Sequence, residues 1–240
     1  MKTIVIIQAR MGSSRLPGKI LKKLGDVEVL TYDIERCRAI EGISEVIVAT
    51  SDLPQDDAIA HWCERYGVAY YRGSEDDVLD RYVQCANMYK PEYVMRVTSD
   101  CPFVDYEMAS EMVSLMKKEQ KDIVLLDGNP PRGLAVELLS YEALLHIHKV
   151  GKEPRHREHV TYFAYEHAEK FNSVTYQVPS NRIAPELRIT LDTYEDYQLV
   201  SAIANHFDDS LVSSSKVIQY LRETPEVAAL NAHIEQKPVI

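Results

Sequence analysis

Hydrophobic positions along residues 3–126 follow two patterns that alternate. Short runs of consecutive apolar, often β-branched residues are typical of buried strands, whereas stretches with apolar positions three or four apart are typical of helices. The pattern predicts strands at residues 3–9, 45–50, 68–71, 93–98 and 122–126, and helices at residues 29–40, 55–66, 76–88 and 106–118. Because apolar strands separated by helices form parallel sheets that are covered on both faces, the sequence predicts an α/β fold.

The pattern becomes less regular after Asn129. A Pro-Pro-Arg-Gly turn, a short extended stretch (Val-Glu-Leu-Leu-Ser) and two helices come next. Strands are then expected at residues 173–178 and 187–191, and helices at residues 194–205 and 216–221. We find no internal repeat or linker, so we expect a single α/β domain over residues 1–240, with an insertion or dimerisation element at about 129–182.

The charge balance limits the classes of partner. The chain of 240 residues carries 37 acidic and 27 basic side chains, which gives a formal net charge of −10. A nucleic-acid-binding protein is expected to be basic, so we expect no nucleic-acid partner. The apolar runs are shorter than the roughly 20 residues that a membrane span needs, and the N-terminal run lacks a signal-peptide cleavage site. We therefore expect a cytoplasmic protein without membrane association.

The four cysteines are scattered along the chain and form no Cys-x-x-Cys pair. Their spacing is typical of neither a zinc site nor a disulfide framework. We expect reduced, mostly buried thiols.

The segment after the first predicted strand has the composition of a phosphate-binding loop. In open α/β sheets, ligands bind beyond the carboxyl ends of the strands. Here the sequence continues as Ala-Arg-Met-Gly-Ser-Ser-Arg-Leu-Pro-Gly-Lys, in which Gly12 and Gly18 permit tight turns and Arg15 and Lys19 supply positive charge. Free N–H groups beside such cations suit a polyphosphate. The spacing is not that of a Walker A loop, and an ordinary polar loop is the alternative.

Two aspartates are expected at the same edge of the sheet. Asp100 follows the strand at residues 93–98, and Asp192 follows the strand expected at 187–191. Mg2+ takes only one or two carboxylates from a protein and keeps waters and phosphate oxygens as its other ligands, so the two aspartates could share one ion. The alternative for Asp192 is the N-cap of the helix that follows it.

Basic residues also gather at 155–159, in Arg-His-Arg-Glu-His. The order of the residues is not that of a His-Glu-x-x-His zinc site. A cationic rim for an anionic sugar or phosphate and a solvated helix start are both open interpretations. At residues 74–79 a helix cap is favoured, and Asp80 and Arg81 are compatible with a surface ion pair.

Five blocks, taken together, resemble one family. They are QARMGSSRLPGK, GSEDDVLDRY, RVTSDCPFVD, REHVTYFAYE and LRITLDTYEDYQL. These blocks are similar to those of the cytidylyltransferases that make CMP-activated acidic sugars, such as CMP-sialic acid and CMP-ketodeoxyoctonate synthetases. The similarity is greatest to the branch of spore coat polysaccharide biosynthesis proteins (SpsF). The resemblance implies a three-layer α/β/α Rossmann-like sandwich of the nucleotide-diphospho-sugar transferase type, usually a homodimer.

The resemblance also implies roles for individual residues. The nucleotide would be CTP, bound with Mg2+, and the acceptor a sugar or acidic sugar. Nucleotide binding would fall to Ala9, Arg10, Gly12, Ser13, Ser14, Arg15, Lys19, Arg81 and Asp100. Among these, Arg15, Lys19 and Asp100 would be catalytic, and Asp100 and Asp192 would hold the metal. The resemblance and the cationic-rim interpretation together assign acceptor binding to Glu137, Arg157 and His159.

One departure from the family pattern concerns the acceptor. The family would have Gly-Leu-Asp-Val-Glu where this chain has Gly-Leu-Ala-Val-Glu, so that Ala135 replaces an aspartate and Glu137 remains. We therefore keep three hypotheses. The favoured one is nucleotidyl transfer from CTP to a sugar with release of pyrophosphate. The others are a glycosyltransferase that consumes a nucleotide sugar, and a nucleotide-binding subunit of a polysaccharide pathway that has lost its activity.

Overall fold

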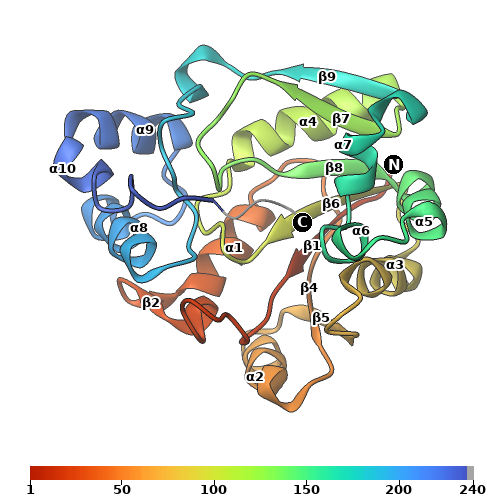
Figure 1. Ribbon diagram of the computed structural model, residues 1–240, viewed down its shortest axis with the longest axis horizontal. Coiled ribbons are helices and arrows are strands. Elements are labelled where there is room, and N and C mark those ends of the chain that lie inside the picture. Colours follow the sequence, from red (N-terminus) through yellow and green to blue (C-terminus); the bar gives the residue numbers. More distant parts are fainter. Residues whose placement is uncertain (237–240) are drawn as a thin grey trace.

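β-Branched runs form the centre of the sheet. The computed structural model describes residues 1–236, and in it four strands pair in parallel (Figure 1). These strands are β5 (Ala69–Gly73), β4 (Glu45–Ser51), β1 (Thr3–Gln8) and β6 (Tyr93–Thr98), in that spatial order. At the middle of β1, Ile6 lies between Ile47 of β4 and Arg96 of β6. The carboxyl ends of these strands therefore open at one edge of the sheet.

Three further strands extend the sheet beyond β6. They follow in the order β8 (Glu137–Ser140), β7 (Ile123–Asp127) and β9 (Ser173–Gln177). β8 runs antiparallel to both of its neighbours, and β7 and β9 are parallel to each other. The sheet is thus mixed but mostly parallel, and the region from 129 to 182 contributes β8 and β9 to it. That this region mediates dimerisation stays a prediction.

Helices cover both faces of the sheet, which confirms the predicted three-layer α/β fold (Figure 1). On one face, Val5 and Ile7 pack with apolar residues of α1 (Val29–Arg38), α2 (Asp57–Tyr66) and α4 (Tyr106–Glu119). On the other face, Ile4 and Ile6 pack with α3 (Val78–Tyr89), α5 (Tyr141–Val150) and α7 (Tyr162–Glu166). Short α6 (Pro154–Glu158) lies on the same side, in contact with α3.

A third apolar cluster lies beside the sheet. It joins residues of α8 (Tyr194–Phe207) and α9 (Ser214–Glu223) to Phe103 and Leu134, and α10 (Pro225–Ala228) packs at its border. The sequence pattern predicted α8 and α9 but missed α10. It also missed the hairpin of β2 (Lys23–Leu24) and β3 (Val27–Glu28) and the 3-10 turns η1 (Lys19–Leu21), η2 (Pro54–Asp56), η3 (Ala168–Lys170) and η4 (Ser180–Arg182). Elements of two to four residues are too short to show a period.

The strand expected at residues 187–191 is wrong. The segment is extended, but it pairs with a loop through a single bridge between Arg132 and Arg188 and is not part of the sheet. The loop comes close because Gly133 has a φ of +98° and no side chain; a Cβ there would lie 2.5 Å from the carbonyl oxygen of Ile189. The alternate side chains Leu187, Ile189 and Leu191 are buried in the third cluster, which explains the strand-like pattern.

Two smaller expectations concern the whole chain. All four cysteines are free thiols, three buried and Cys101 partly exposed, as predicted. Among residues 1–236, no helix has both the length and the apolar composition for crossing a membrane.

Candidate functional site

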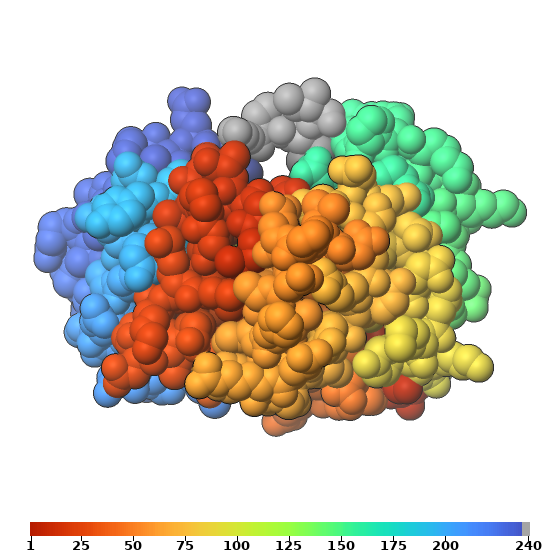
Figure 2. Space-filling view, turned by 90° about the horizontal axis from the view of Figure 1, so that it is seen from below, coloured from red at the N-terminus to blue at the C-terminus, as the bar shows by residue number. Residues whose placement is uncertain are grey.

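The loop after β1 lies at the carboxyl edge of the parallel strands. Figure 2 shows the surface of this N-terminal segment (red) between the segment around α2 (orange) on one side and the C-terminal helices (blue) on the other. The loop begins at Ala9, whose N–H still bonds to the carbonyl of Ala49 on β4, and it ends where Lys19 starts η1.

The loop folds back on the peptide of Met11. The carbonyl of Met11 accepts hydrogen bonds from the N–H groups of Ser13 (2.9 Å) and Gly18 (3.1 Å), and Gly18 adopts the left-handed conformation that glycine favours. In contrast, the N–H groups of Gly12, Ser14 and Arg15 have no acceptor within residues 1–236. Unpaired backbone donors at the end of a strand can bind a phosphate group.

Both predicted aspartates meet the cations of this loop. The Lys19 ammonium lies 2.9 Å from Oδ1 of Asp192 and 3.4 Å from Oδ2 of Asp100, and it donates to the carbonyl of Leu191 at 2.7 Å. The Arg15 guanidinium lies 2.5 Å from Oδ2 of Asp192. Residues far apart in the sequence therefore converge as the sequence predicted, although the structure does not test their roles.

Asp192 does not cap α8. The N-cap is Thr193, whose hydroxyl accepts from the N–H of Asp196 at 3.3 Å, and Asp196 completes a capping box. The fully buried Asp196 also accepts from the N–H of Asp192 and from the guanidinium of Arg188. The N-cap interpretation was thus wrong by one residue, and the carboxylate of Asp192 is free to pair with Arg15 and Lys19, with the Arg188 guanidinium 3.7 Å away.

The charge state of Asp100 depends on this network. Burial alone raises the pKa of its carboxyl, but the Lys19 charge and hydrogen bonds from Thr98 and Cys101 outweigh burial and hold that pKa below its ordinary value. Asp100 is therefore a carboxylate at neutral pH. Two such carboxylates fit a divalent ion that takes its remaining ligands from water and phosphate. No group of three or more acidic, histidine or cysteine side chains within residues 1–236 could hold a metal without such help.

A third acid, Asp33 on α1, lies beneath the network and was not foreseen. It is fully buried and neither carboxyl oxygen has a hydrogen-bond partner within the described part of the chain. Burial raises its pKa well above the ordinary value; the charge of Asp100 adds to this, while Lys19 and Arg36 oppose it.

This pKa predicts a stability that falls as pH rises. The folded state holds a proton on Asp33 that the unfolded chain releases at the ordinary pKa, so folding becomes less favourable between those two pKa values. Asp33→Leu is expected to raise the free energy of unfolding at pH 7 by about 1–3 kcal/mol, the usual cost of an unpaired buried polar group. Urea unfolding at pH 7 and pH 4 measures this. The gain should shrink at pH 4, and a less stable variant at pH 7 would contradict the prediction.

The predicted nucleotide-binding residues on the other side of the loop differ in exposure. Arg10 is half exposed and pairs with Glu75 at 3.3 Å. Arg81 is buried and donates to the carbonyl of Ser74 at 2.9 Å. Burial lowers the pKa of its guanidinium, and the nearby charge of Glu75 opposes this shift. The surface ion pair with Asp80 was therefore wrong, because Asp80 pairs with His148. The side chains of Arg10, from the loop, and Arg81, from α3, thus both reach the segment that follows β5.

The predicted acceptor residues divide into two places. Glu137 on β8 stands opposite Arg96 on β6, pairs with it at 2.7 Å, and accepts from the Thr161 hydroxyl. Burial lowers the pKa of the nearby His159, and the charges of Arg96 and Glu137 have smaller, opposite effects on it. Arg157 instead pairs with Asp77, the N-cap of α3, and donates to the carbonyl of His148 at 3.2 Å.

Arg96 is a residue that the sequence reasoning missed. It also donates to the side chain of Gln8 at 3.1 Å, so it ties the ends of β1, β6 and β8 together. The signal was available, because an arginine inside an otherwise apolar strand is rarely buried without a partner. Ala135 is exposed and lies two residues before Glu137. In an extended segment, a longer side chain at position 135 would lie on the same side as that of Glu137.

The cationic-rim interpretation of residues 155–159 is only partly compatible with the structure. Arg155 pairs with Glu153 and Glu166, and buried His156 bonds to Glu166 at 2.8 Å. Acidic partners therefore already neutralise much of this charge.

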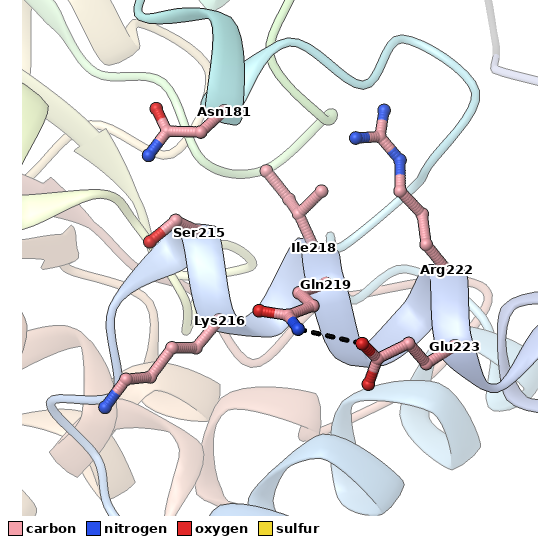
Figure 3. Close-up of a pocket in the computed structure, with 7 residues that line it drawn as sticks. All are labelled: Asn181, Ser215, Lys216, Ile218, Gln219, Arg222 and Glu223. Carbon is pink, nitrogen blue, oxygen red and sulfur yellow. Dashed lines mark hydrogen bonds between the residues drawn. The ribbon is translucent and has the colours of Figure 1, made fainter.

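A pocket of about 450 Å³ lies elsewhere, between η4 and α9 (Figure 3). Its lining residues include Asn181, Lys216 and Arg222, but none of the candidate site residues. We assign no ligand to it.

Comparisons with known proteins decide the family. A family model described as cytidylyltransferase matches residues 4–237. The chain belongs to the cytidylyltransferase family.

Individual relatives agree with this family. The chain is 34% identical, over 94% of its length and 96% of the relative's, to the spore coat polysaccharide biosynthesis protein SpsF of Bacillus subtilis. It is 31% identical to the 3-deoxy-manno-octulosonate cytidylyltransferase of Thermodesulfovibrio yellowstonii, over 51% of each chain. A solved cytidylyltransferase structure from Leptospira borgpetersenii superposes with a TM-score of 0.89 at 29% identity, covering 99% of this chain and 100% of that one.

Proposed function

We propose that this cytidylyltransferase-family protein is a CTP-dependent sugar nucleotidyltransferase that requires Mg2+ and serves polysaccharide biosynthesis. The observation that carries the proposal is the convergence of three unpaired loop N–H groups, Arg15, Lys19 and two carboxylates at the edge of one sheet. Family membership supports nucleotidyl transfer over the glycosyltransferase alternative. We further propose that the acceptor is a sugar or acidic sugar and that the protein works as a cytoplasmic homodimer.

The proposed reaction requires the protein mainly to position the reacting groups and to stabilise the negative charge on the phosphates. An oxygen of the acceptor sugar forms a bond to the α-phosphorus of CTP, and the bond from that phosphorus to the bridging oxygen of the β-phosphate breaks, so that pyrophosphate leaves. The N–H groups of Gly12, Ser14 and Arg15, together with Arg15 and Lys19, would hold the β- and γ-phosphates. They would neutralise the charge that grows on the leaving pyrophosphate.

Asp100 and Asp192 would hold Mg2+ with the help of phosphate oxygens. The bound ion would supply positive charge at the α-phosphate. Ala9, Arg10, Ser13 and Arg81 would complete the nucleotide site, and Glu137, His159 and Arg157 the acceptor side. Because Glu137 is already paired with Arg96, a sugar hydroxyl could bond to its second oxygen without leaving that carboxylate uncompensated.

Nucleotide binding is expected to stabilise the protein. CTP at a hundred times its Kd, with Mg2+, should raise the free energy of unfolding by about 2.7 kcal/mol. A thermal-shift screen of CTP, UTP, ATP and GTP with Mg2+ measures the preference, and pyrophosphate release with a panel of acidic sugars measures turnover. Arg15→Ala should reduce the shift. If no triphosphate shifts the unfolding temperature, the proposal fails; if CTP binds but no acceptor yields pyrophosphate, the inactive-subunit hypothesis is favoured instead.

A further inference from the structure

Asp56 stands at the N-cap position of α2 but does not cap that helix. An aspartate at this position normally accepts a hydrogen bond from an N–H in the first helical turn. Here Oδ1 accepts instead from the N–H of Met11 at 2.7 Å, and Oδ2 accepts from the hydroxyl (2.5 Å) and the N–H (3.3 Å) of Ser51. The carboxylate therefore joins the loop after β1 to the end of β4.

Asp56 is buried, so its carboxylate needs these hydrogen bonds. The residue is fully buried, and it forms no ion pair within residues 1–236. A buried carboxylate without a cation is unfavourable unless several donors solvate it. Helix capping does not account for the residue, so its distinctive contribution is an acceptor placed at the N–H of Met11.

The backbone of Met11 is held on both sides of its Cα. Asp56 fixes its N–H, and its carbonyl accepts from Ser13 and Gly18 at the two ends of the turn. These bonds hold the two peptide groups that flank the Met11 Cα, and therefore the start of the turn that carries the unpaired N–H groups of Gly12, Ser14 and Arg15. The neighbouring Gln55 packs against the same loop, because a Cβ on Gly12 would lie 3.0 Å from its side-chain nitrogen.

We propose that Asp56 is a positioning residue for the triphosphate: acting through Met11, it holds the loop in the conformation that presents its free N–H groups. Asp56 itself touches no substrate. The inference deepens the proposed function and rests on it for the identity of the ligand, but the positioning of the loop can be measured without any nucleotide.

The test compares Asp56→Ala with Asp56→Asn. Asparagine keeps an oxygen that can accept from Met11, and the Ser51 hydroxyl can turn to accept from its amide, whereas alanine removes the acceptor. In the ligand-free protein, amide hydrogen exchange at Met11, Ser13 and Gly18, whose N–H groups are hydrogen-bonded in the loop, should become about tenfold faster in Asp56→Ala, the effect of losing one bond to a charged acceptor. Calorimetric titration with CTP and Mg2+ should show binding about tenfold weaker. Asp56→Asn should stay within about threefold of the original protein in both measurements.

Asp52→Ala is the matched control, since Asp52 is an exposed aspartate of the same connection whose side chain has no hydrogen bond or ion pair within the described chain, and its backbone bond to Gly73 is kept in the variant. Unchanged loop exchange in Asp56→Ala, with or without a loss of global stability, would overturn the proposal. So would an Asp56→Asn protein as defective as Asp56→Ala, or an equal effect of Asp52→Ala. If the original protein binds no CTP, the proposed function fails, while the exchange measurement still decides whether Asp56 positions the loop.

Discussion

Asp100→Asn is expected to lower the rate of CTP-dependent pyrophosphate release about a hundredfold, the usual cost of losing one preorganised charged contact in an active site. The change is nearly isosteric, so it removes the negative charge that faces Lys19 without opening a cavity. Steady-state kinetics with saturating CTP and Mg2+ measure the effect.

The exposed Asp76 gives the matched control, because Asp76→Asn makes the same chemical change where no contact within residues 1–236 is lost. This variant should keep its activity. Near-normal turnover of Asp100→Asn would remove Asp100 from the mechanism, whereas equal losses in both variants would show that the assay responds to something other than the site.

Lys19→Met is expected to move two measurements in opposite directions. In the ligand-free protein, the ammonium of Lys19 occupies both carboxylates that would hold a metal. Its removal leaves two acids without their shared cation, so binding of Mn2+ in the absence of nucleotide should strengthen about tenfold. Turnover with CTP should nevertheless fall about a hundredfold, because a cation that stabilises the leaving pyrophosphate is lost.

Mn2+ binding can be followed by electron paramagnetic resonance. Lys23→Met is the control, since Lys23 is exposed and, within residues 1–236, its ammonium bonds only to the carbonyl of Asp26. Weaker Mn2+ binding in Lys19→Met would mean that the ammonium does not compete with the metal for these carboxylates, and unchanged turnover would remove Lys19 from the phosphate site.

Much of the fold could be predicted because the signals were local. The strands β1, β4 and β6 have six or seven residues, of which most are apolar and many are β-branched, and the helices between them repeat with a helical period. The segment from Leu187 to Leu191 misled the prediction for a physical reason. Alternate burial produces the same pattern whether an extended segment pairs with a strand or, as here, with a loop at Arg132.

The site was predictable where residue type alone suggests chemistry. Glycines, serines and cations after β1 pointed to a phosphate loop, and the ends of extended segments pointed to Asp100 and Asp192. Asp56 was not predictable in this way. An aspartate before a helix is normally its cap, and only the coordinates show that Asp56 binds Met11 instead. Asp33 likewise gave no signal, because its burial on α1 depends on how the helix is oriented.

The central claim is that the loop from Gly12 to Lys19 and the two aspartates bind one metal-bound triphosphate. A crystal structure with Mg2+ and a non-hydrolysable CTP analogue measures this most directly. We expect phosphate oxygens against the N–H groups of Gly12, Ser14 and Arg15, the metal between Asp100 and Asp192, and Lys19 turned from the carboxylates to the phosphates. A triphosphate bound away from this loop, for example in the pocket beside α9, would contradict it.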